Sequence, residues 1–133
     1  MALALRKSDA LTTGIDPSPS REQVLARYRQ LREIARRHNG EICTRLSLDA
    51  MLQQARRLGL ARGKTFILDD MEELVYVNDL CIHTASPGRS RPINRYARSA
   101  DLPAGSDEAL VLEAMRAARF SILVIEAVTK RRD

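Results

Sequence analysis

The chain has 133 residues, 44 % of them hydrophobic and 29 % charged, which is typical of a globular domain and excludes a disordered protein. Two cysteines are too few for a secreted disulfide scaffold, and no apolar run is long enough to cross a membrane, so we expect a cytoplasmic protein without membrane contact. The net charge of +5, with nineteen arginines among 22 basic residues, weakly favours an anionic partner.

The N-terminal part of the chain divides into a lead-in and a first helix. Residues 1–19 are rich in small polar residues, glycine and proline, so we expect a disordered lead-in. Ser20 and Gln23 fit a capping box at the start of a helix that ends near residues 38–40. The apolar stripe of this helix is formed by Val24, Leu25, Tyr28, Leu31, Ile34 and Ala35.

Two further helices follow, with a short β segment between them. The second helix lies between Ser47, its N-cap, and Gly59, just beyond its last turn. A basic turn follows, and residues 65–68 then favour a brief strand. Asp69 or Asp70 is expected to cap the third helix, whose wide apolar face predicts a central position.

The last part of the chain predicts two more helices and an ambiguous C-terminal segment. Pro92 suits the first turn of a short fourth helix, and Ser106 opens a fifth. Residues 120–128 are rich in β-branched side chains but are not separated from the fifth helix by glycine or proline, so helix continuation and strand both stay open. We favour a strand, which needs the 65–68 segment or a partner subunit beside it.

The predicted fold class is therefore mainly α. We expect about five helices in a compact orthogonal bundle, with one or two short β segments at residues 65–68 and 120–128. Residues 20–133 form a single helical domain. Two explanations of its C-terminal segment stay open: the chain is the N-terminal part of a longer protein, or it is one subunit of a dimer.

The stretch GLARGKTFILDD, residues 59–70, contains the Gly63-Lys64-Thr65 ending of a phosphate-binding loop. Such a loop needs four residues between its glycines and follows a strand, so that backbone amides surround the phosphates. Here only three residues separate Gly59 from Gly63, and a helix precedes them. The pattern therefore argues against a nucleotide site and for a helix end followed by a turn.

Residues 47–68 fit a helix-turn-helix motif better. Ala55, Gly59 and Leu60 occupy the positions of its small residue, turn glycine and following apolar residue, and a recognition helix would start near Arg62. The acidic residues just beyond it would repel DNA, because they carry the same charge as the phosphates.

Catalytic and metal-binding patterns are weak. His38, Cys43, Cys81 and His83 are the only histidines and cysteines. Residues two apart on a helix point about 200° away from each other, so Cys81 and His83 are poorly placed to share a zinc ion or to act as a nucleophile and base. We expect no catalytic residue, metal or cofactor, and regard a thiol or metal site here as the weakest of the functional readings.

These patterns predict a non-catalytic interaction or regulatory protein. Its partner would be another protein, or a second copy of the chain, bound through residues 120–128. The alternative is a DNA-binding regulator that uses residues 47–68, since nucleic acid is an anionic partner that suits the basic side chains. The candidate surface for an anionic partner consists of Arg29, Arg32, Arg36, Arg37, Arg56, Arg57, Arg62 and Lys64.

Overall fold

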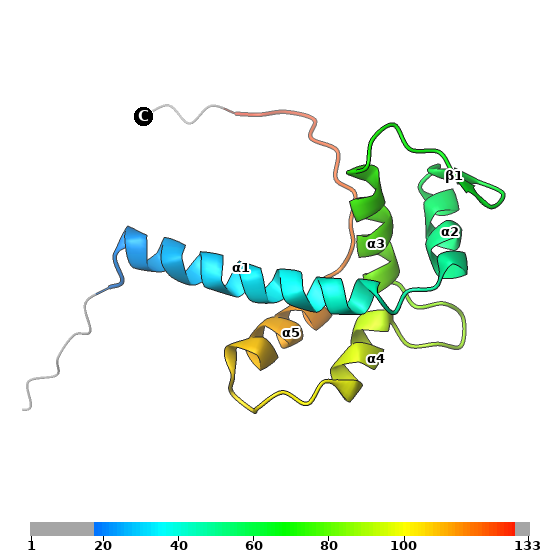
Figure 1. Ribbon diagram of the computed structural model, residues 1–133. Helices are drawn as coiled ribbons and strands as arrows, with labels where there is room; N and C mark the ends of the chain where they lie inside the picture. Colours follow the sequence, from blue (N-terminus) through cyan, green and yellow to red (C-terminus); the bar gives the residue numbers. More distant parts are fainter. Residues whose placement is uncertain (1–17, 130–133) are drawn as a thin grey trace, which may run out of the picture.

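The computed structural model describes residues 18–129, which contain five helices and one short hairpin (Figure 1). This confirms the predicted fold class, mainly α with compact packing of helices; the predicted lead-in lies almost wholly outside the described residues. None of the described helices is both long and apolar enough to cross a membrane. The elements are α1 (Arg21–Cys43), α2 (Leu48–Arg57), β1 (Ala61–Arg62), β2 (Thr65–Phe66), α3 (Glu73–His83), α4 (Pro92–Ser99) and α5 (Asp107–Ala117).

Helix α1 begins where the sequence predicts but ends later. The capping box is present: the Ser20 hydroxyl accepts from the Gln23 amide at 3.3 Å, and the Ser20 amide donates to the Gln23 side chain at 2.8 Å. The helix then continues through Gly40 to Cys43, whereas the sequence predicted an end at residues 38–40. Glycine costs a helix only about 1 kcal/mol, which the burial of the Ile42 side chain outweighs.

The segment between α2 and α3 is a hairpin and not a simple basic turn. β1 pairs antiparallel with β2, with Ala61 opposite Phe66. Gly63 has a φ of 61°, which a tight two-residue hairpin turn requires at its first central position. The predicted strand at 65–68 is therefore confirmed only over its first two residues. The N-cap of α3 is Glu72, and not Asp69 or Asp70 as predicted, although the Asp70 carboxylate accepts from the amides of Glu72 and Glu73 at 2.7 and 3.1 Å.

The core consists of two clusters that meet at α3. Ile82 of α3 packs with Ile42, Ile93 and Leu112, which come from α1, α4 and α5. Val77 and Cys81 of the same helix pack against Ala55 of α2. The third helix is central, as its wide apolar face predicts.

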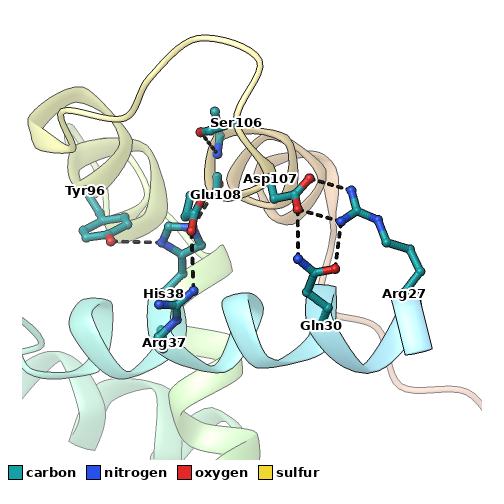
Figure 2. Close-up of polar contacts among 9 residues, drawn as sticks. Arg27, Gln30, Arg37, His38, Tyr96, Ser106, Asp107 and Glu108 are labelled. Atoms are coloured by element: carbon teal, nitrogen blue, oxygen red, sulfur yellow. Dashed lines mark hydrogen bonds and ion pairs between the residues drawn. The ribbon is translucent and has the colours of Figure 1, made fainter. Parts of the chain in front are cut away.

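Polar contacts fix α1 against α4 and α5 (Figure 2). The buried His38 ring lies 3.0 Å from the Glu108 carbonyl oxygen through Nε2, and 3.0 Å from the Tyr96 hydroxyl through Nδ1. A carbonyl can only accept, so Nε2 carries the hydrogen, and Nδ1 accepts from the tyrosine. Farther out, the Arg27 guanidinium donates to Asp107 at 2.6 Å and lowers the pKa of that carboxyl group.

Two glycines with open space around them are expected to respond in opposite directions to alanine. Neither Gly40 nor Gly59 has an atom within 4 Å of an added Cβ, but Gly59 has a φ of 76° and Gly40 is helical. Gly40→Ala should raise the free energy of unfolding by about 0.5–1 kcal/mol. Gly59→Ala should lower it by about 1–2 kcal/mol, because alanine is strained in that conformation. Urea unfolding measures both, and a loss of stability in Gly40→Ala would contradict the continuous helix.

Removal of the Tyr96 hydroxyl should destabilise the fold. Tyr96→Phe leaves the buried Nδ1 of His38 without its donor, which should lower the free energy of unfolding by about 1–3 kcal/mol in urea unfolding. Tyr28→Phe is the matched control, because that exposed hydroxyl contacts only Arg32 and its loss should change stability by less than about 0.5 kcal/mol. Equal effects of the two substitutions would argue against the role of His38.

Candidate functional site

The C-terminal segment, residues 118–129, contains the most exposed large apolar side chains of the described residues. It forms neither helix nor strand, so the predicted strand at 120–128 is absent, and α5 does not continue into it. The β segment that could have paired with it, Thr65–Phe66, is paired with β1 instead. The large apolar side chains are 73–85 % exposed and comprise Ile122, Leu123, Val124, Ile125 and Val128. In Figure 1 the segment runs past α3 and away from the helices.

A groove lies where this segment leaves the helices. It forms a cavity of about 760 Å³ between α1, α3, the end of α5 and the first residues of the segment. Ala35 of α1, Tyr76 of α3, Met115 of α5 and Phe120 contribute apolar side chains to its wall. The segment is thus attached at its start and free beyond Ile122. Nothing in the local sequence around Tyr76 or Met115 marked them in advance, since they meet only through the packing of α3 and α5.

The apolar stripe of α1 is only partly buried. Ile34 is buried and Leu31 half-buried, but Val24, Leu25 and Tyr28 are 41–53 % exposed. The reason is visible in Figure 1, where the N-terminal half of α1 extends beyond α5. The sequence predicted one continuous buried stripe, whereas the structure leaves its outer half uncovered. This exposed part is called the outer stripe below: Val24, Leu25 and Tyr28.

The eight predicted anion-binding residues do not form one surface. Four lie on α1, and four on α2 and the hairpin, which extend to different sides of the molecule (Figure 1). On α1, Arg36 pairs with Glu33 at 3.4 Å, and Arg37 pairs with Glu108 of α5 at 3.5 Å. The positive charge of that helix is therefore partly neutralised.

The helix-turn-helix prediction is wrong in its second half. Arg62, where a recognition helix was expected to begin, lies in β1, and the next helix starts only at Glu73. The Arg56 side chain is engaged by the hairpin, where it donates to the Gly63 carbonyl at 3.0 Å. The hairpin therefore takes the place of a helix that could enter a DNA groove.

Both cysteines pack in or against the core. Burial raises the pKa of the Cys81 thiol to about 11, so the thiol stays protonated at neutral pH, and it lies 3.7 Å from the Ala50 carbonyl oxygen. Burial also raises the pKa of Cys43. Between residues 18 and 129, no group of three or more His, Cys, Asp or Glu side chains is placed to hold a metal ion.

Comparison with known proteins identifies the family of the chain. Residues 22–133 match the model of a family of unknown function (DUF7986), and the chain belongs to that family. No curated protein matches the sequence significantly, and no solved structure matches it significantly. No activity is known for this family, so a function can be inferred only from the surfaces and cavities of the molecule.

His83, in the last turn of α3, should make stability depend on pH. Burial lowers the pKa of its imidazole, Arg91 lowers it further, and Asp79 opposes both. The unfolded chain therefore takes up a proton near pH 6.5 while the folded chain resists it, so the free energy of unfolding should fall as the pH decreases below that value. Urea unfolding at about pH 7 and about pH 5.5, without multivalent anions, measures this loss.

The matched variant for this prediction is His83→Gln. It should lose less stability than the natural chain between the same two pH values, because glutamine does not titrate. Asp79, whose pKa is raised by burial, acts in the opposite direction and is present in both proteins. Identical losses in the two proteins would contradict the role of His83.

Proposed function

We propose that the protein is a non-catalytic interaction protein whose binding element is residues 120–128, and whose partner is a second copy of the same chain. The observation that carries this proposal is the exposure of five large apolar side chains in one short segment. Scattered exposed apolar residues are normal on a monomer, whereas a contiguous run usually marks an interface.

The composition of the segment suits pairing with another strand. In an extended chain, successive side chains point to opposite faces. Ile122 and Val124 would then lie on one face, and Leu123 and Ile125 on the other. Both faces would be apolar, as in strands that are covered on both sides, so solvent is a poor environment for this segment. Strand pairing would also satisfy the backbone groups that no hydrogen bond within the segment uses.

A second copy supplies a suitable partner because each chain carries two uncovered apolar parts. The outer stripe of α1 is about half exposed among the described residues, and it can cover part of one face of a ribbon formed by two copies of residues 120–128. A nine-residue strand is about 30 Å long and the outer stripe spans about 6 Å of the helix axis, so the stripe would cover the ribbon locally. Only one charged residue, Glu126, lies in the segment, so pairing two copies brings few like charges together.

The mass of the protein in solution tests this proposal. We expect a dimer in sedimentation equilibrium, and a double variant, Leu123→Asp with Ile125→Asp, should raise the dissociation constant at least about 100-fold, which is about 2.8 kcal/mol. Both side chains are exposed in the single chain, so the substitutions should leave the helical fold intact by circular dichroism. The matched control is Leu48→Asp, an exposed apolar residue at the start of α2, which should leave the dimer unchanged.

Three outcomes would contradict the proposal. A monomeric natural chain at high concentration would exclude the second copy as partner, even if another protein binds the segment. A dimer that survives the double variant would place the interface elsewhere. A dimer that Leu48→Asp disrupts equally would show that any added negative charge opposes association.

A further inference from the structure

A second cavity lies on the molecule where the ends of four helices meet. Its volume is about 760 Å³, and we call it the arginine cavity because Arg57, Arg91, Arg116 and Arg119 line it. These residues come from the end of α2, the N-cap of α4, the end of α5 and the start of the C-terminal segment. None of the described residues that line the cavity is acidic. Four arginines and no acidic residue therefore line one space.

Neutral oxygen atoms hold two of these cations together. The Asn94 side-chain oxygen accepts from Arg91 at 3.4 Å and from Arg116 Nε at 3.3 Å. Arg91 also donates to the main-chain carbonyl of Arg116 at 2.8 Å. The one carboxylate that pairs with either guanidinium in the described chain is Glu113, 2.7 Å from Arg116. Two like charges held side by side repel each other, and a bound anion would relieve that repulsion.

No carboxylate among the described residues pairs with the other two arginines, Arg57 and Arg119. The Arg57 guanidinium donates to the neutral side-chain oxygen of Gln54 at 2.9 Å. Arg119 is exposed, and no carboxylate among the described residues pairs with it. A guanidinium has five N–H donors in a planar fork, so both side chains keep donors for a ligand.

His83 adds a polar atom without a partner. It lines the arginine cavity, and its Nδ1 is buried with no hydrogen bond to any described residue. Such an atom costs a fold about 1–3 kcal/mol, and in a native protein it often marks a functional place. An anion in the cavity would favour the protonated imidazole, whose Nδ1–H could then donate to it.

We propose that the arginine cavity binds a phosphate monoester. The doubly charged phosphate group suits several planar guanidinium forks, which match its oxygen atoms in pairs. The organic part would pack on the apolar side of the wall, which Leu58, Leu80 and Phe120 provide. The volume is within the range of small-molecule sites, about 300–1,000 Å³. Every residue of the cavity belongs to one chain, and the four arginines and His83 lie outside the segment 120–128, so the anion site can be tested whether or not the dimer forms.

Isothermal titration calorimetry with three probes tests the ligand class. Phenyl phosphate should bind most tightly, because it offers both the dianion and an apolar ring. Inorganic phosphate should bind at least about tenfold more weakly, and benzoate, with one charge and the same ring, should give no measurable heat. Equal affinity for both phosphates would overturn the placement of the organic part. Benzoate binding as tightly as phenyl phosphate would overturn the phosphate class.

Paired variants locate the site. Arg57→Gln with Arg119→Gln should weaken phenyl phosphate binding at least about tenfold, without loss of a contact between helices. Arg56→Gln with Arg62→Gln removes the same charge from neighbouring positions that do not line the cavity, so affinity should stay within about twofold. If both double variants weakened phenyl phosphate binding equally, the effect would come from the net positive charge of the protein and not from the cavity, and the proposal would be overturned.

The imidazole of His83 gives a second, independent readout. In proton NMR its pKa should rise when phenyl phosphate saturates the natural chain, since the anion stabilises the charged ring. The ring proton signals of His38, which is buried between α1, α4 and α5, should change much less. Absence of binding, or binding without a rise in the pKa of His83, would overturn the site. Failure of the dimer in sedimentation would leave these measurements interpretable, because they report on a single chain.

Discussion

The hydrogen bonds of one buried imidazole determine how the longest helix sits on the rest of the molecule. His38 joins α1 to the Tyr96 hydroxyl of α4 and to the Glu108 carbonyl of α5, and its two ring nitrogens are both satisfied. The fully buried residues of α1, Ile34, His38 and Ile42, all lie in its C-terminal half. This short contact therefore orients the whole helix, and the exposure of its outer stripe follows from it. The groove beside α3 depends on the same orientation.

Local rules predict where helices begin, and tertiary contacts decide where they end. Ser20, Ser47 and Ser106 each accept an amide hydrogen bond three residues ahead, a contact that needs no other part of the chain. The end of α1 beyond Gly40 could not be predicted in this way, because it depends on Ile42 reaching α3, α4 and α5. The segment 120–128 is a harder case still. Its β-branched composition indicates a strand, but the two strands of the described residues, β1 and β2, are only two residues long and pair with each other, so they offer a nine-residue segment very little edge.

The candidate sites show the same limit. A helical stripe of arginines can be found from sequence spacing, and Arg57 was found that way, but most of that predicted surface is divided between separate elements. Arg91 lies at least 25 residues before Arg116 and Arg119, and no helical spacing connects it to them or to Arg57, so the sequence did not indicate that these arginines meet. A single half-buried side chain, Asn94, brings two of them together. A contact of this kind, between side chains of different helices, leaves no periodic pattern in the sequence.

The distance along the chain between α1 and its partners also bears on how the protein folds as it is synthesised. Tyr96 lies 58 residues after His38, and Glu108 lies 70 residues after it. Helix α1 leaves the ribosome before its partners and is therefore among the last of the described elements to dock, whereas α2, the hairpin and α3 are neighbours and can assemble earlier. Until α5 has been made, α1 can pack on α3 and α4 only, and the part of its apolar face that α5 covers is open to wrong association. A nascent chain that stops short of α5 would thus carry a formed but undocked helix, and would be a natural client for chaperones.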